Sequence, residues 1–127
     1  MDAKTFCEKL ASYGNNMDDK GFSDQFTEDA TIRMGNMPPI HGKANIAAFS
    51  KELSNSVNSM HYEIVSVEET PNFIVWQCMT TIQSKNDCVT ITFPECHILR
   101  REGDKLKVVQ VYADTSSILE SCEVKSK

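Results

Sequence analysis

Apolar side chains in the first part of the chain recur at the spacing of an α-helix. Within residues 3–17 they come in steps of four, three and four, at Phe6, Leu10, Tyr13 and Met17. This spacing places them on one face of a helix, because a turn takes 3.6 residues. We therefore expect a first helix that packs one apolar face against the rest of the protein.

Two later segments show the same helical spacing. Phe22 and Phe26 are four residues apart and predict a second, short helix. A third helix is expected after Gly42, with its apolar face formed by Ile46, Phe49 and Leu53. Between the second and third helices, residues 31–33 predict a short strand. Residues 35–39 predict a loop, because they end in two successive prolines.

From residue 60 onward the pattern changes to alternation, which is typical of β-strands. Four long strands are predicted, at residues 60–69, 73–83, 88–100 and 105–114. Short turns between successive strands favour an antiparallel meander, and helices that precede it must pack on one face of that sheet. Pro94 cannot donate to a sheet ladder, so an edge position or a bulge is expected there. The predicted class is α+β, with a strongly bent sheet wrapped around three N-terminal helices.

Composition sets the outer limits of function. The chain of 127 residues is expected to form a single domain over residues 1–127, with a flexible tail at residues 121–127. The formal net charge of −5 argues against nucleic-acid binding, which depends on Lys and Arg. No apolar run reaches the ~18 residues that a membrane helix needs, so no membrane partner is expected.

Cysteine usage bears on location and on metal binding. The five cysteines form no CxxC pair and have no histidine at zinc-finger spacing. The N-terminal residues do not resemble a secretory signal. These observations favour reduced thiols in a cytoplasmic protein without a metal site.

Several short motifs, in order and spacing, resemble one known family. They are Phe26–Thr31 (FTEDAT), residues 35–42 (GNMPPIHG), residues 44–49 (ANIAAF), His61 at the start of a strand, and Tyr112-x-Asp114 at the end of the last strand. In these the chain resembles the SnoaL-like branch of the nuclear-transport-factor-2-like superfamily, also called the cystatin-like cone fold, over residues 5–119. The resemblance implies a cone-shaped barrel whose mixed or antiparallel sheet encloses an apolar cavity. It implies cofactor-free polyketide cyclases, isomerases and dehydratases, or non-enzymatic modules of the same fold.

Two better-known reactions of this superfamily lack their acids here. By resemblance, the catalytic carboxylate of ketosteroid isomerase would stand at Met34 and its second carboxyl at Cys96. The acid of limonene epoxide hydrolase would stand at Val111. None of these three residues is acidic, so neither route is expected.

The remaining candidates for acid–base chemistry are His61, Asp114 and Tyr13. Related cyclases use an aspartate near the position of Asp114, and burial in an apolar cavity favours the neutral form of a carboxyl group. His61 would supply the complementary proton, since histidine changes charge near neutral pH. Tyr13 would polarise a substrate carbonyl. The competing interpretation is structural: Asp114 caps backbone groups at a strand end, and His61 and Tyr13 are ordinary partly buried residues.

The predicted cavity walls complete the hypothesis. They are Phe22, Phe26, Met34, Met37, Phe49, Trp76, Cys96 and Tyr112. If Cys96 faces inward, alternation along the strand turns His97 to the outer face, where the apolar positions of the sheet predict a homodimer. The predicted function is a cofactor-free isomerase, cyclase or dehydratase for a small apolar metabolite bearing a carbonyl group. The alternative is a non-catalytic small-molecule-binding or dimerisation module.

Overall fold

The computed structural model describes residues 1–114, which form three helices and six strands. In chain order the elements are α1 (Ala3–Asn15), α2 (Asp19–Ser23), β1 (Phe26–Met34), β2 (Ile40–His41), α3 (Lys43–Asn55), β3 (Val57–Glu69), β4 (Ile74–Ser84), β5 (Thr90–Glu102) and β6 (Lys105–Ala113). The tail that the sequence predicts to be flexible, and Cys122 within it, lie outside the described residues.

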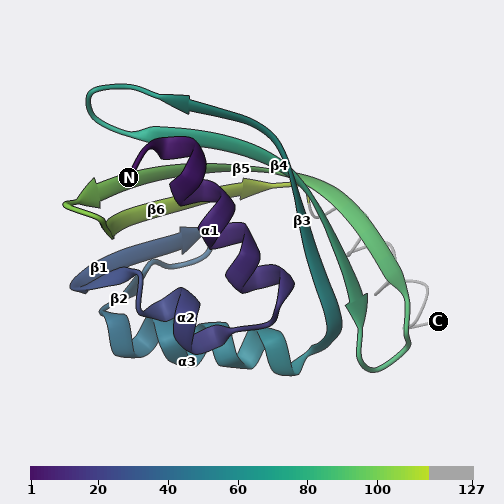
Figure 1. Cartoon of the computed structure of the whole chain (residues 1–127). Coiled ribbons are helices and arrows are strands. Elements are labelled where there is room, and N and C mark those ends of the chain that lie inside the picture. Colours follow the sequence, from purple (N-terminus) through teal and green to yellow (C-terminus); the bar gives the residue numbers. More distant parts are fainter. Residues whose placement is uncertain (115–127) are drawn as a thin grey trace.

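The strands form one curved, open sheet in the order β2-β1-β6-β5-β4-β3. Strands β3 to β6 make the predicted antiparallel meander, and β1 joins it in parallel with β6, where Ile32 pairs with Val109. All three helices lie on one side of this sheet (Figure 1). The α+β prediction is confirmed, with a sheet that curves around the helices without closing into a barrel.

Helix α1 is held against β3 by close contacts at its C-terminal end. The side chain of Asn15 accepts a hydrogen bond from the backbone N–H of Tyr62 at 2.6 Å. A Cβ atom placed on Gly14 would stand 2.3 Å from the Tyr62 ring, so only glycine lets the helix come this near. At the other end of the helix, Phe6 is buried and lies under the Arg101 guanidinium, 4.9 Å from the ring centroid. The contacts of Gly14 and Asn15 place the Tyr62 ring directly against the end of α1.

The sequence prediction for Phe26 is wrong in one respect. Helix α2 ends at Ser23, and Phe26 is the first residue of β1 rather than part of the helix. The four-residue spacing was misleading because both phenylalanines face the core from different elements. Their rings meet edge to face, with centroids 5.2 Å apart.

Pro94 lies in β5, an interior strand of the sheet, at a position where the neighbouring strand β6 has just ended. It pairs with Met79 of β4, and that pairing runs without a register shift. Its carbonyl accepts a hydrogen bond of 3.2 Å from the backbone N–H of Asp114, just past the end of β6. The N–H and C=O of one strand residue point to the same side. The side on which Pro94 lacks an N–H is therefore the side towards the end of β6, where the sheet ladder stops.

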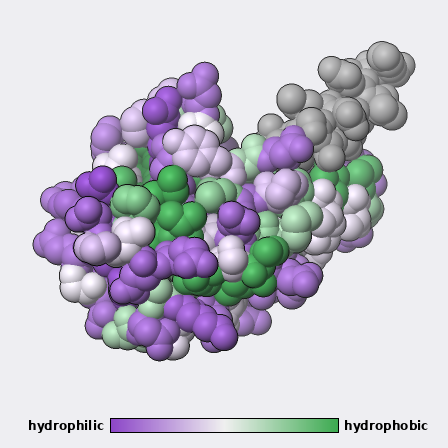
Figure 2. Space-filling view, turned by 90° about the horizontal axis from the view of Figure 1, so that it is seen from above, coloured by the Kyte–Doolittle hydropathy of each residue, from purple (hydrophilic) through white to green (hydrophobic). Residues whose placement is uncertain are grey.

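The convex face of the sheet carries exposed apolar side chains. Val65, Val108 and Tyr112 are 61%, 40% and 55% exposed. Hydrophobic residues also form a band between hydrophilic margins on the face seen in Figure 2. No helix within residues 1–114 has the length and apolar character needed to cross a membrane.

The homodimer expected from the sequence stays a prediction. We expect light scattering at micromolar concentration to give twice the chain mass of 14.3 kDa, because exposed apolar sheet faces usually pair. The substitution Val65→Lys should shift the mass towards the monomer, while Val89→Lys on the β4–β5 connection serves as control. A monomeric mass for the unaltered protein would contradict the prediction.

Candidate functional site

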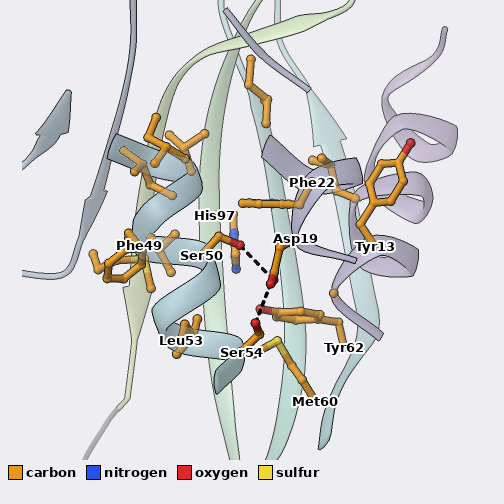
Figure 3. Close-up of a pocket in the computed structure, with 18 of the residues that line it drawn as sticks. Tyr13, Asp19, Phe22, Phe49, Ser50, Leu53, Ser54, Met60, Tyr62 and His97 are labelled. Atoms are coloured by element: carbon orange, nitrogen blue, oxygen red, sulfur yellow. Dashed lines mark hydrogen bonds between the residues drawn. The ribbon is translucent and has the colours of Figure 1, made fainter. Parts of the chain in front are cut away.

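A cavity of about 90 Å³ lies between the concave face of the sheet and the three helices. Its walls are mostly apolar, and five aromatic rings take part, from Tyr13, Phe22, Phe49, Tyr62 and Trp76. Figure 3 shows Tyr13, Phe22, Phe49 and Tyr62 around the cavity, on α1, α2, α3 and β3. A cavity of ~150 Å³ holds benzene. A ligand of that size therefore requires some outward movement of a wall here.

The floor of the cavity is built from the inward-facing residues of β4 and β5. In the antiparallel register Trp76 stands opposite His97, and Cys78 stands opposite Glu95. Alternation along β5 turns Glu95, His97 and Leu99 to the same side. The result is a carboxyl group and an imidazole set among apolar residues.

Glu95 is 7% exposed and has defined partners. The Thr80 hydroxyl donates a hydrogen bond to one carboxylate oxygen. The second oxygen lies 3.7 Å from His97 Nε2, within ion-pair range when the imidazole is protonated. Within residues 1–114, two buried side-chain atoms have no hydrogen-bond partner, His97 Nε2 and Trp76 Nε1. Both belong to this floor, so the polar groups that remain unsatisfied in the described fold are concentrated in the cavity.

Two neighbouring groups stay neutral at physiological pH. Burial raises the pKa of the Cys78 thiol to about 11. Burial, with a smaller contribution from the Glu95 charge, moves the pKa of the Tyr62 hydroxyl well above its usual value. Neither group can serve as a base at neutral pH, which leaves Glu95 and His97 as the ionisable pair of the floor.

The same floor contains one cluster with potential metal ligands. The ligand atoms of Cys78, Glu95 and His97 lie within 4.8 Å of one another, the one such group in the described part of the chain. Metal binding requires the thiolate, and the raised pKa of Cys78 opposes its formation. In addition, the Thr80 hydroxyl contacts both Cys78, at 3.5 Å, and Glu95. The arrangement fits a hydrogen-bonded carboxyl better than a metal ligand set, and the expected absence of a metal stays a prediction.

The mouth of the cavity has its own polar cluster. Asp19 in α2 accepts hydrogen bonds from Ser54 at 2.7 Å and from Ser50 at 3.5 Å, both in α3. Figure 3 shows these two bonds bridging the helices across the cavity. The cluster holds α2 and α3 together and sets the width of the entrance.

Removing the shorter of these bonds should loosen the mouth measurably. We expect Ser54→Ala to lower the free energy of unfolding by about 1 kcal/mol, the usual net contribution of such a bond. Ser50→Ala is the matched control and should cost less, because its bond is longer. Urea unfolding followed by circular dichroism measures both. A larger loss for Ser50→Ala would contradict this account of the mouth.

The structure distributes the sequence-predicted wall residues over four places: the cavity, the core behind it, the loop after β1 and the convex side of the sheet. Four of these eight residues line the cavity, namely Phe22, Met34, Phe49 and Trp76, and so does Tyr13, the predicted polarising group. Phe26 is buried in the core behind it, and Met37 is 56% exposed in the loop after β1. The Tyr13 hydroxyl accepts a hydrogen bond from the Gln25 side chain at 3.4 Å. Its polarising role stays a prediction.

The expected pair of His61 and Asp114 is not found in the cavity. Both residues are exposed, and neither is among the residues that line it. Tyr62 faces inward, and alternation along β3 therefore turns His61 outward. Asp114 lies beside a shallow hollow on the convex side of the sheet. This placement corrects the expectation that the two residues form an acid–base pair around a bound ligand.

The predicted orientations along β5 are reversed. His97 faces the cavity, whereas Cys96 and Tyr112, both predicted wall residues, line the convex hollow. Aligning Cys96 with a catalytic position of a relative predicts the opposite alternation, with Cys96 inward and His97 outward. Buried Leu99 in the same strand gives the correct alternation. Alternation counted from Leu99 places both His97 and Glu95 on the cavity side. Glu95 is the site residue that was not predicted from the sequence.

Four described cysteines are free thiols, in keeping with the expected reduced state: Cys7, Cys78, Cys88 and Cys96. Burial raises the pKa of Cys7 to about 12. This thiol is therefore inert as a nucleophile.

Taken together, an open curved sheet, three covering helices and a mostly apolar cavity between them define a cone-type α+β fold. The SnoaL-like domain model matches residues 8–109, and the chain belongs to that family. No curated protein is significantly similar to it in sequence.

Solved structures share the whole fold at low sequence identity. A protein from Catenulispora acidiphila with a ketosteroid isomerase-like fold, in complex with trimethylamine, has a TM-score of 0.85 at 15% identity, covering 94% of this chain and 92% of its own. A putative isomerase from Bacillus subtilis gives 0.82 at 14%, with coverages of 93% and 90%. A putative SnoaL-like polyketide cyclase from Jannaschia sp. gives 0.77 at 11%, with 92% and 90%. At such low sequence identity, the structural similarity establishes the fold and does not establish the activity, which depends on the residues of the site.

Proposed function

We propose that this protein is a cofactor-free enzyme that moves a proton on a small apolar molecule bearing a carbonyl group, as an isomerase, cyclase or dehydratase does. One observation carries the proposal. Glu95 and His97 lie 3.7 Å apart on the floor of an apolar cavity, and His97 Nε2 has no hydrogen-bond partner among the described residues. An acid and a base side by side in a water-poor site are the minimum that such chemistry needs.

The proposed step begins with the carboxylate of Glu95. It takes a proton from the carbon next to the carbonyl, so that a C–H bond breaks and an O–H bond forms on Glu95. The electron pair moves to the carbonyl oxygen and gives an enolate. In a β,γ-unsaturated ketone the enolate is conjugated with the C=C bond, so the proton can return from Glu95 to the γ-carbon; this shifts the double bond and restores the carboxylate. His97 Nε2 faces this exchange and can hold or pass the proton.

Hydrogen exchange tests the proposal without knowledge of the natural substrate. Cyclopentanone in D₂O exchanges its α-protons when a base removes them, and NMR follows the loss of the proton signal. We expect the protein to accelerate this exchange above the rate in buffer containing bovine serum albumin at equal concentration. Equal rates, over a series of ring and open-chain ketones and enones, would contradict the proposal.

A second candidate is a non-catalytic binding module for small amines. In the described part of the chain, three carboxylates line the cavity, from Asp18, Asp19 and Glu95, and no Lys or Arg does. Acidic groups beside aromatic faces favour a cation, and the Catenulispora relative was solved with trimethylamine. Calorimetry with trimethylammonium and its neutral isostere tert-butanol separates the candidates. Strong preference for the cation, without proton exchange on ketones, would favour the binding module.

A further inference from the structure

The indole N–H of Trp76 is a buried donor without an acceptor. Trp76 is 3% exposed, its side chain lines the cavity, and Nε1 has no hydrogen-bond partner in the described fold. An indole N–H can only donate, and leaving it unsatisfied in a buried place costs free energy. Buried tryptophans usually find a partner. The natural place for the missing acceptor is the cavity that the ring borders.

The second unsatisfied nitrogen lies beside the first. Trp76 and His97 face each other across β4 and β5, and their ring centroids are 4.6 Å apart. His97 Nε2 is in turn 3.7 Å from the Glu95 carboxylate. A donor and an acid–base pair are thus adjacent on one floor. The geometry suits a ligand whose acceptor atom and reacting carbon are close together, as they are in a ketone.

The charge of the lining limits what this acceptor can be. Carboxylates of Asp18, Asp19 and Glu95 border the cavity, and within residues 1–114 no cationic Lys or Arg lines it. A carboxylate or phosphate ligand would enter without a counter-charge and beside like charges, which is unfavourable in a site of low dielectric constant. The acceptor is therefore an uncharged oxygen.

We propose that Trp76 Nε1 donates a hydrogen bond to the uncharged carbonyl oxygen of the ligand in this cavity, and so selects ketones over carboxylic acids of the same shape. This inference rests on the proposed function, because it supplies the group that receives the developing negative charge. When the α-proton leaves, that charge forms on the carbonyl oxygen, and a hydrogen bond from Trp76 Nε1 stabilises the enolate.

The sequence offers a direct probe, since it contains one tryptophan. A ¹⁵N-labelled sample therefore gives a single indole N–H cross-peak in the NMR spectrum. We expect cyclopentanone to move this proton downfield, in the direction of a stronger hydrogen bond. Methylenecyclopentane has the same shape without the oxygen and should leave the peak near its original position. Cyclopentanecarboxylate should leave it unmoved at the concentration at which the ketone saturates.

The variant Trp76→Phe keeps an aromatic ring and removes the donor. We expect cyclopentanone to bind about threefold to tenfold more weakly to it, the equivalent of one hydrogen bond. Methylenecyclopentane should bind both proteins within about twofold. If the variant does not fold, the indole shift in the unaltered protein decides alone.

Each result has one meaning. Equal indole shifts with ketone and hydrocarbon, or no shift with either, would overturn the proposal, as would equal binding of the carboxylate. Because the indole readout needs binding and no turnover, it separates this inference from the proposed function. A ketone-specific shift without α-proton exchange would support the hydrogen bond and count against the enzyme.

Discussion

Glu95→Gln is expected to slow the protein-catalysed α-proton exchange of cyclopentanone by about 100-fold to 10,000-fold, the contribution that a positioned base usually makes. The carboxylate is the proposed base, and glutamine cannot take a proton. Its side-chain oxygen can still accept the hydrogen bond that Thr80 donates to Glu95. The change therefore removes the chemistry and leaves the shape of the floor. Exchange rates by NMR in D₂O measure the effect.

The matched control is Glu63→Gln. Glu63 is exposed on β3 and is not among the residues that line the cavity. The same chemical change there should leave the exchange rate within about twofold, since surface substitutions have small effects. Equal slowing by both substitutions would mean that overall charge, and not the buried carboxylate, governs the rate.

The second large effect concerns the wall formed by α3. Ile46 is the one buried residue of this helix and is 1% exposed. It therefore anchors the helix to the rest of the core. Ile46→Ala should lower the free energy of unfolding by about 2–5 kcal/mol, the range for large apolar side chains cut back in a core. Urea unfolding followed by circular dichroism measures the loss.

Leu53→Ala is the control for this prediction. Leu53 also lies on α3 and borders the cavity, but it is 36% exposed at the mouth. Its loss should cost less than half as much as that of Ile46, because less apolar surface leaves water when it packs. Equal losses at the two positions would show that α3 is held by its whole length and not by Ile46.

Much of the fold follows from local pattern. The 3.6-residue spacing predicted α1 and α3, and alternation with short turns predicted the meander of β3 to β6. These elements are predictable because their apolar faces must all be buried against one another. The parallel pairing of β1 with β6 joins segments far apart in the chain, and no local pattern specifies it. The family resemblance implied a mixed or antiparallel sheet and did not specify this pairing.

The site was predicted less well, for a reason specific to strands. A shift of one residue turns every side chain of a strand to the other face. Aligning Cys96 with a relative's catalytic position therefore moved His97 outward and hid Glu95. Among the predicted wall residues, Phe22, Phe49 and Trp76 do line the cavity. The unsatisfied Trp76 N–H could not have been foreseen, since burial and missing partners are properties of the folded structure.

The central claim is that acid–base chemistry resides on the concave floor and not at the end of the last strand. The most direct test measures α-proton exchange side by side in the unaltered protein, Glu95→Gln and Asp114→Asn. Glu95 is buried in the cavity, whereas Asp114 lies by the convex hollow. The account predicts that exchange is lost in Glu95→Gln and retained in Asp114→Asn. Retention in Glu95→Gln with loss in Asp114→Asn would contradict it.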